Sequence, residues 1–418
     1  MTAPARTGPL TGIRVLEIGS IGPGPFCAML LADLGADVLR VDRAAGGGLV
    51  GPNADHRTEL MHRGRRSMAL DLKHPDGAGV VLDLIETADV LIEGFRPGVA
   101  ERLGIGPDAC HERNPRLVYG RMTGYGQDGP MAQAVGHDIN YVALSGVLGM
   151  IGREGQPPTT PLSLVGDFGG GGLTLAMGIL AALVERQSSG LGQTIDAAMV
   201  DGAATLATAF FGFSQTGAWS PERGTNLVDG GAPFYDTYEC ADGGWLSIGP
   251  LEPPFYAAML GVLGLDGEDL PAQYDRSGWP TLRERFATTI RTRTRDEWAA
   301  AADGIECCVS PVLTVDEVAD HPHLKARGTF VEHEGLVQPA PSPRFDRTPA
   351  HLDRQPPLPG EHTEEALGDW GIGADRVAAL IADGVVGRAD GGGAAGGGSA
   401  DAGPTSDAPA VARTEVAS

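Results

Sequence analysis

Two segments of the sequence place ionisable side chains between a glycine and an apolar helical stretch. In AVGHDINYVALSG, His137 and Asp138 follow Gly136, and Asp138 stands where a helix would start. In LVGDFGGGGLTLAMGIL, Asp167 ends an apolar run just before four glycines that open a second helix. Amides at a helix start can stabilise an oxyanion, and a glycine run lets a ligand come close to the backbone. His137 and Asp167 are therefore candidate catalytic groups.

Each of these residues also has a purely structural interpretation. A lone histidine is more often a satisfied structural residue than a catalyst, and an ordinary helix cap explains Asp167 taken alone. A cap does not explain the glycine run that follows Asp167. On residue types alone, both interpretations stay open.

The elements that must hold these residues are predicted as alternating strands and helices. Residues 13–18 form an apolar run that is followed by a Gly/Pro turn, the helical stretch FCAMLLADLG and a second run, ADVLRVD, ending in Asp42. A strand, helix, strand unit of this kind implies a parallel sheet. The pattern recurs in VVLDLIETA, DVLIEGF and RLVYGRMTGYG, which predicts an α/β region over the first 140 or so residues.

The rest of the chain predicts a second, smaller domain. LTLAMGILAALVER reads as a helix, and TIDAAMVDGAATLATAFFGFSQTG reads as a strand that continues into a long helix. A strand pair with its turn at Asp242 and Gly243, and helices near 253–263, 280–292 and 295–302, predict an α+β domain. We expect a large domain over 1–198 that is completed by about 331–382, a linker helix over 199–234, and a small domain over 235–330. Within the last part of the chain, residues 339–360 are expected to be loop-like and a short helix is expected near 363–382. Residues 386–418 are expected to form a disordered Gly/Ala-rich tail.

Composition excludes several classes of partner. The net charge of −23 and the pI near 4.7 repel phosphate backbones and anionic membrane surfaces, so nucleic acid and membranes are not expected as partners. No signal-peptide stretch and no apolar run of about 18 residues is apparent, so no membrane span is predicted. The five cysteines include no C-x-x-C pair, which indicates reduced thiols in a cytoplasm.

The glycine-rich turn after the first strand resembles a dinucleotide-binding loop only in part. Gly19, Gly22 and Gly24 give G-x-x-G-x-G instead of G-x-G-x-x-G. Pro25 also stands where a helix should expose an amide to a pyrophosphate. A structural turn is therefore favoured over NAD binding.

Basic residues gather in one part of this acidic chain. The cluster has two interpretations, a site for an anionic ligand or a solvated face that balances nearby acidic groups. Residue types alone do not separate the two. Its members are Arg40, Arg43, Arg57, Arg63, Arg65, Arg66, Lys73, Arg96 and Arg102.

Longer motifs occur in a fixed order along the chain. They are GIRVLEIGSIGPGPFCAMLLADLGADVLRVDR, IEGFRPGV, RMTGYGQDGP, GHDINYVALSG, VGDFGGG, GQTIDAAMVDG, DGGAPFYDTYEC and LEPPFYAAML. From about residue 8 to about residue 355, the sequence resembles the α-methylacyl-CoA racemase branch of the family III CoA-transferase superfamily. The tail beyond about residue 385 has no counterpart there. ATLATAFFGFSQTG, expected to line the acyl chain, is rich in Ala and Phe where known racemases can use methionine.

The resemblance implies a set of site residues. The family's catalytic histidine and aspartate fall on His137 and Asp167, and the glutamate that supports the histidine falls on Glu252. Its CoA-binding positions fall on Arg43, Leu70, Asp71, Leu72, Lys73, Gly94, Phe95, Arg96, Arg102, Gly136, Asp138, Ile139, Asn140 and Tyr141. The adenosine phosphates and pyrophosphate of CoA then become the anion for the basic cluster. CoA is part of the substrate, so neither a cofactor nor a metal is implied.

The resemblance also implies a fold and a reaction. The expected fold is α/β, with a large Rossmann-like domain and a smaller α+β domain in an interlocked homodimer. Its active site lies between the large domain of one chain and the small domain of the partner. The expected reaction is inversion of the α-carbon of 2-methylacyl-CoA thioesters, which needs a base on one face of a planar enolate and an acid on the other. The acyl group itself stays open between a sterol side chain, a branched fatty acid and a small catabolic intermediate.

Two other functions compete with racemisation. A family III CoA transferase would use Asp167 as a covalent nucleophile and would need no opposing histidine. The GHDINY motif, and the absence of a transferase-type glycine-rich loop around DGGWLSIGPLEPPF, favour the racemase. A non-catalytic acyl-CoA-binding protein is disfavoured because His137, Asp167 and Glu252 are all retained.

Overall fold

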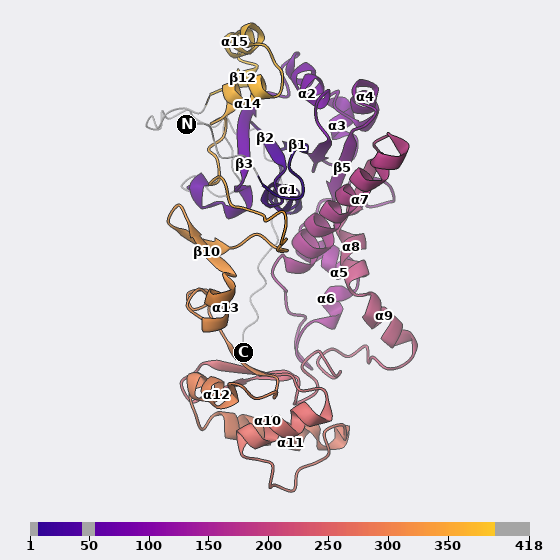
Figure 1. Ribbon diagram of the computed structural model, residues 1–418. Helices are drawn as coiled ribbons and strands as arrows, with labels where there is room; N and C mark the ends of the chain where they lie inside the picture. The colour runs from indigo at the N-terminus through magenta and orange to yellow at the C-terminus, as the bar shows by residue number, and fades with distance from the viewer. Residues whose placement is uncertain (1–6, 44–54, 389–418) are drawn as a thin grey trace, which may run out of the picture.

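A seven-stranded sheet forms the centre of the larger part of the molecule in the computed structural model, which describes residues 7–43 and 55–388 (Figure 1). The strand order is β12-β3-β2-β1-β4-β5-β6, and every pairing is parallel except that of β12 with β3. Apolar side chains of the central strands are buried on both faces, as a parallel sheet requires. The strands are β1 (Arg14–Ile18), β2 (Asp37–Arg43), β3 (Arg65–Leu70), β4 (Val90–Glu93), β5 (Val118–Thr123), β6 (Thr194–Ala198) and β12 (Val386–Gly387).

Helices cover both faces of this sheet. α1 (Pro23–Asp33) and α7 (Thr174–Ser189) pack on one face. On the other face lie α2 (Gly77–Ile85), α4 (Pro107–Arg113), α14 (Thr363–Asp369) and α15 (Ala374–Ala382). The parallel part of the sheet has the order 3-2-1-4-5-6 that is typical of doubly wound folds. In such sheets the order reverses between β1 and β4, and ligands bind outside the carboxyl ends of the strands at that point.

A three-stranded antiparallel sheet has a core of its own in the lower part of Figure 1. The predicted strand pair is confirmed as β7 (Asp236–Glu239) and β8 (Trp245–Ile248), and β9 (Val309–Val312) completes the sheet. The three predicted helices are confirmed as α10 (Pro253–Leu263), α11 (Trp279–Ile290) and α12 (Arg295–Ala302). The chain returns to the large sheet through α13 (Pro322–Arg327) and the hairpin of β10 (Phe330–His333) and β11 (Leu336–Pro339).

Two helices that were expected to be continuous are interrupted. The long helix after β6 divides into α8 (Met199–Leu206) and α9 (Thr208–Gln215), and residues 216–235 contain no further helix or strand. At the break, the Thr208 hydroxyl donates to the Thr205 carbonyl at 2.6 Å, which competes with the helical bonding pattern. The single helix expected near 363–382 is two helices, because Gly371 between them takes a φ of +97°.

One helical segment has the length and hydropathy of a membrane span, which was not identified from the sequence. The π-helical η3 (Leu164–Leu173) continues directly into α7, and together Leu164–Ser189 are long and apolar enough to span a membrane by length and composition. Inside this protein α7 is a core helix that packs against β5 and β6. Only 44% of the most apolar 18-residue stretch of Leu164–Ser189 is buried, however, so part of this helical segment is apolar and exposed.

The carboxyl end of the described chain contradicts the predicted start of the tail. Val386 and Gly387 form β12 against β3, and Val386 is 2% exposed. The described chain is thus ordered through Arg388, and residues 389–418 lie outside the described part of the chain. Local composition did not predict β12, because its two residues are ordered by β3, about 300 positions earlier in the sequence.

Truncation before Val386 is expected to lower the free energy of unfolding by about 2 kcal/mol, the usual contribution of one buried valine side chain. The measurement is thermal or denaturant unfolding of a chain that ends at Val385. A chain that ends at Arg388 keeps β12 and is the control, which is expected to unfold as the full-length protein does. Equal stability of the two truncated chains would contradict a structural role for β12.

Most of the basic cluster is structural, which neither sequence interpretation foresaw. Four of its arginines are buried and form ion pairs with carboxylates, and Arg57 pairs with Glu361 at 2.7 Å. The buried pairs are Arg40 with Glu17 and Asp42, Arg63 with Asp33, Arg65 with Glu17, and Arg66 with Asp37 and Asp369. The basic side chains that stay exposed, with no ion pair to another described residue, are those of Arg43, Lys73, Arg96 and Arg102.

Candidate active site

The turns that follow β1, β4 and β5 line one cavity of about 730 Å³. They contribute residues 20–24, 94–97 and 122–125. The cavity thus lies where the strand order reverses, at the carboxyl ends of neighbouring parallel strands. This is the position at which a doubly wound sheet binds its ligand.

The opposite wall of the cavity carries His137. His137 is the residue that precedes α5 (Asp138–Leu144), and Asp138 is the first helical residue, so the helix starts one position earlier than a cap at Asp138 would give. The backbone N–H of His137 donates to Oδ1 of Asn140 at 3.0 Å, and the Tyr141 hydroxyl donates to the carbonyl of Gly136. Both bonds hold the loop of the exposed His137, whose side chain lines the cavity.

Asp167 enters the same cavity from η3. π-Helical turns are rare and are frequent at functional sites. Gly22, in the turn after β1, faces the carboxyl so closely that a Cβ there would lie 2.9 Å from Asp167 Oδ2. The glycine at this position, with a φ of +66°, allows the turn to approach the carboxyl.

The glycine run after Asp167 serves helix packing, and the expected role in ligand approach is not what the structure shows. A Cβ at Gly170 would lie 2.6 Å from the amide nitrogen of Ala203 in α8. A Cβ at Gly172 would lie 2.6 Å from the carbonyl oxygen of Pro23 in α1. Both glycines are buried. The run therefore lets η3 pass between the backbones of two helices, and this packing fixes the position of Asp167.

Burial changes the acidity of Asp167. Desolvation and then the neighbouring charge of Asp138 raise the pKa of the Asp167 carboxyl to about 6, against a smaller lowering effect of His137 and of a hydrogen bond from Ser163. A carboxyl with this pKa is present in both protonation states near neutral pH. It can therefore act as an acid or as a base without a large energetic cost.

The structure brings together some of the predicted CoA-binding positions and not others. Gly94, Phe95, Arg96, Gly136, Asn140 and Tyr141 line the cavity with His137 and Asp167. Arg43 lies at the end of β2, beside a separate small hollow that also contains His56 and His62. Arg102 is exposed at the end of α3 (Val99–Arg102). Asp138 is buried, and Ile139 is 41% exposed on α5.

The remaining predicted positions lie away from the cavity. Leu70 is 2% exposed in the core, and Asp71, Leu72 and Lys73 follow it at the end of β3, where Asp71 accepts a hydrogen bond from the Lys73 amide at 2.9 Å. Glu252 is the exposed residue that precedes α10 in the lower domain, and it does not line the cavity of its own chain.

Several lining residues were not predicted individually. Gly22, Tyr125, Val135 and Met199 all line the cavity. Tyr125 could have been predicted as a lining residue, because it follows a predicted strand of a parallel sheet and the carboxyl ends of such strands meet at one edge. No local signal marks Met199, which reaches the cavity from the first turn of α8.

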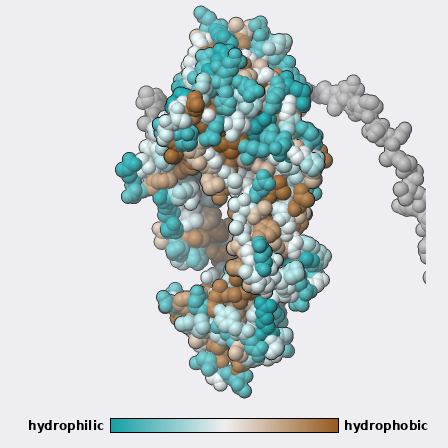
Figure 2. Space-filling view, turned by 90° about the vertical axis from the view of Figure 1, so that its right-hand side faces the viewer, coloured by the Kyte–Doolittle hydropathy of each residue, from teal (hydrophilic) through white to brown (hydrophobic). Residues whose placement is uncertain are grey.

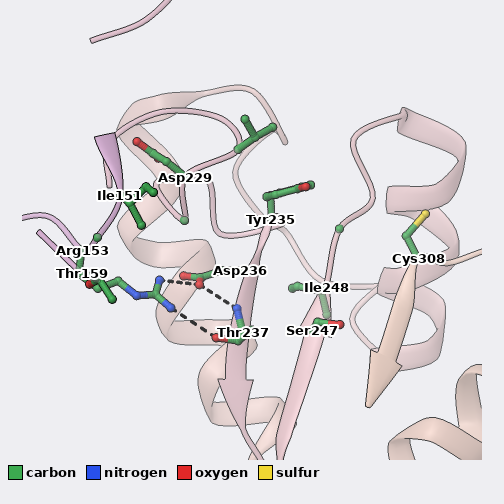
Figure 3. Close-up of a pocket in the computed structure, with 14 residues that line it drawn as sticks. Ile151, Arg153, Thr159, Asp229, Tyr235, Asp236, Thr237, Ser247, Ile248 and Cys308 are labelled. Carbon is green, nitrogen blue, oxygen red and sulfur yellow. Dashed lines mark hydrogen bonds and ion pairs between the residues drawn. The ribbon is translucent and has the colours of Figure 1, made fainter. Parts of the chain in front are cut away.

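Two further cavities share Ile151 and Gly152, which follow α6 (Val147–Met150), and Val228 and Asp229, which precede the smaller domain. One, of about 530 Å³, is bordered by Arg153, whose guanidinium pairs with Asp236 of β7 at 2.5 Å and contacts the Thr237 hydroxyl at 3.4 Å (Figure 3). The other, of about 430 Å³, is mainly apolar and is lined by Val147, Met150, Val165, Leu206, Phe210 and Trp219 among others. The region expected to line the acyl chain thus borders an apolar cavity, and Val165, two residues before Asp167, lines the same cavity.

The sequence pattern of CoA-transferase family III matches residues 10–363. The chain belongs to CoA-transferase family III. Within this family it is 45% identical to the proteins named alpha-methylacyl-CoA racemase of Mus musculus and of Homo sapiens, over 90% of this chain and 97% of each of those.

A solved family III structure supports the fold. The CAIB/BAIF family protein from Brucella suis superposes with a TM-score of 0.76 at 26% identity, over 87% of this chain and all of that one. The α/β fold with a large parallel sheet is therefore shared with a solved member of the family.

Proposed function

We propose that this family III chain is a racemase that inverts the α-carbon of 2-methylacyl-CoA thioesters. One observation carries the proposal: a histidine and an aspartate whose pKa is raised to about 6 face one cavity at the carboxyl edge of the sheet. The 45% identity to proteins named alpha-methylacyl-CoA racemase, over 97% of their length, supports the same reaction.

The proposed chemistry uses these two side chains as a pair. A proton α to a thioester is far less acidic than any side chain, so the enolate must be stabilised as it forms. The first amides of α5, those of Asp138 and Ile139, precede the helix's own hydrogen bonds and are available to the thioester oxygen. When His137 is neutral and Asp167 is protonated, His137 removes the α-proton of one enantiomer and Asp167 delivers a proton to the opposite face. That transfer leaves His137 protonated and Asp167 ionised, which is the state that serves the other enantiomer.

The edge of the sheet offers a path for the CoA moiety. The predicted binding positions Arg43, Leu70 and Gly94 lie at or directly after the carboxyl ends of β2, β3 and β4. At about 4.8 Å between strands, the edge from β3 to β5 extends roughly 19 Å. We propose that CoA lies along this edge, with its thioester between His137 and Asp167. The four exposed basic residues of the cluster are its phosphate contacts.

Arg102→Ala is expected to raise KM for the CoA thioester several-fold at low salt and by less at high salt, because screening weakens an exposed charge contact. Arg113→Ala is the matched control, since Arg113 is also an exposed arginine and pairs with Glu86. The measurement is KM at two ionic strengths. An unchanged KM at low salt would remove Arg102 from the CoA site.

We also propose that the protein is a homodimer whose partner completes the active site. The side of η3 and α7 that faces away from the sheet exposes Leu164, Leu173, Met177 and Val184, each more than half exposed. Figure 2 shows apolar surface around the hollow between the larger and the smaller part of the molecule. An exposed apolar face of this kind is typical of a protein interface. A partner's small domain would supply the Glu252 that one chain does not bring to its own cavity.

Mixed dimers test this shared site. Asp167→Ala and Glu252→Gln chains are co-expressed with different tags and purified through both tags. If Glu252 acts on the partner's cavity, one site of each mixed dimer carries both changes and the other carries none, so roughly half of wild-type activity is expected. The two parent variants are the controls. Activity no greater than the mean of the parents would contradict a site shared between subunits.

The alternative function is CoA transfer through an acyl anhydride on Asp167. The two functions differ in the fate of the α-proton. Incubation of a single 2-methylacyl-CoA enantiomer in D₂O, followed by mass spectrometry and chiral analysis, is expected to show one deuterium at the α-carbon together with inversion. Acyl transfer to an added carboxylate, and an acyl-enzyme trapped by hydroxylamine, without α-deuteration, would identify a transferase.

The remaining features of the proposal follow from the reaction. Both protons are carried by side chains and CoA is part of the substrate, so we propose that turnover needs neither a cofactor nor a metal. The five cysteines are free thiols, which is compatible with the proposed cytoplasmic location. We propose that the acyl group occupies the apolar cavity beside Leu206 and Phe210.

A further inference from the structure

The carboxylate of Asp138 is buried between the two candidate acid/base groups. Asp138 is 7% exposed, and its Oδ1 accepts a hydrogen bond from the backbone N–H of Asp167 at 2.7 Å. Asp138 is also the residue directly after His137. One side chain therefore connects the helix start that carries His137 to the π-helix that carries Asp167, although the two lie 29 residues apart.

Neighbouring residues hold this carboxylate in place. A Cβ at Gly166 would lie 2.3 Å from Asp138 Oδ1 and 3.1 Å from a methyl group of Val142, so only glycine fits beside it. The second oxygen, Oδ2, is buried and has no hydrogen-bond partner within the described part of the chain. A buried carboxylate oxygen without a partner lowers stability, and a catalytic role is one of the explanations for such a group in a native protein.

We propose that Asp138 is a positioning residue of the racemisation reaction, whose carboxylate holds the backbone of Asp167 at a fixed place relative to His137 and sets a negative charge beside the Asp167 carboxyl. The inference rests on the proposed function. It assigns to Asp138 a role through Asp167 that differs from the predicted contact with CoA.

The groups that face Asp167 support this role. From α5, the titratable neighbours are His137, Asp138 and Tyr141, and Asp138 is the charged group that raises the pKa of Asp167. From α1, the residues closest to η3 are Pro23, Phe26 and Cys27, and from α8 they are Met199, Gly202, Ala203 and Leu206. Cys27 is the titratable residue among them, and burial raises the pKa of its thiol well above the usual range, so it stays neutral. Removal of the Asp138 charge is therefore expected to lower the pKa of Asp167 without a compensating change from another neighbour.

Two substitutions separate the charge of Asp138 from its hydrogen bond. Asp138→Asn keeps an acceptor oxygen for the Asp167 amide and removes the charge. We expect the acidic limb of its kcat/KM profile, measured for α-proton exchange, to move to lower pH by roughly one unit. Asp138→Ala removes the acceptor as well, and we expect kcat to fall on the order of ten- to a hundredfold with KM for the thioester little changed. Asp108→Asn, an exposed aspartate in the first turn of α4, is the control.

A second readout does not depend on turnover. The titration of the Asp167 carboxyl is followed by NMR of ¹³C-labelled aspartate, with Asp167→Asn used to assign the signal. A lower pKa in Asp138→Asn than in the wild type supports the inference. An unchanged titration, or a rate that falls equally at every pH, overturns it. If the wild type shows no α-proton exchange, the proposed function fails, while the NMR titration still decides whether Asp138 controls Asp167.

Discussion

His137→Ala and Asp167→Ala are each expected to reduce kcat/KM for racemisation by a factor on the order of 10² to 10⁴, the usual effect of losing one general acid or base. Both side chains face the same cavity, and inversion needs one group to remove the proton and another to deliver it. Neither residue can replace the other, because each is assigned to its own face of the enolate. For the enantiomer whose α-proton Asp167 removes, the wild-type rate is expected to fall as pH drops below about 6, where Asp167 becomes protonated.

Deuterium wash-in separates the two faces. In each variant one base remains, so exchange of the α-proton is expected to persist for one enantiomer and to be lost for the other, with opposite enantiomers in the two variants. His323→Ala and Asp316→Ala, exposed residues of the same types outside the cavity, are the controls. Equal loss for both enantiomers in Asp167→Ala, with none in His137→Ala, would reject two-base catalysis and favour a transferase with Asp167 as nucleophile.

Glu17→Gln is expected to lower the free energy of unfolding by about 3–5 kcal/mol, the usual cost of leaving a buried ion-pair partner without its counter-charge. Glu17 and Arg65 are both 0% exposed, and Arg40 pairs with the other oxygen of Glu17 at 2.6 Å. Arg65 also donates to the Pro25 carbonyl, and Arg40 contacts the Ser20 carbonyl at 3.4 Å. The pair therefore also holds the turn after β1 that lines the active-site cavity.

Denaturant unfolding gives the measurement, and an exposed ion pair gives the control. Glu86 pairs with Arg113 at 2.6 Å with both side chains near half exposed, so Glu86→Gln is expected to change the free energy of unfolding by about 1 kcal/mol or less. The double variant Glu17→Leu/Arg65→Met is expected to be more stable than Glu17→Gln, since no buried charge of that pair is left alone. A loss in Glu17→Gln no greater than in Glu86→Gln would contradict this role.

Much of the architecture could be predicted from the sequence. The apolar runs of β1, β2 and β4, and the helices between them, gave the parallel sheet, because both the hydrophobic period and the turn residues are local properties. The bounds of α10 and α12 and the turn at Asp242 and Gly243 were predicted closely for the same reason. His137 and Asp167 were also singled out from the sequence as candidates, since each follows a glycine or an apolar run at the start of a helix, and both line one cavity.

Tertiary structure alone decided the features that depend on residues far apart in the chain. The arginines of the basic cluster could not be divided into buried ion pairs and exposed ligand contacts until their carboxylate partners were placed. The same holds for the glycines after Asp167, which are explained by the backbones of α1 and α8, and for β12, which exists only against β3. Asp138 is the clearest case, because its carboxylate bonds to an amide 29 residues away. A residue's type and its neighbours in sequence determine its local conformation, but its charge state and its partners depend on what the fold packs around it.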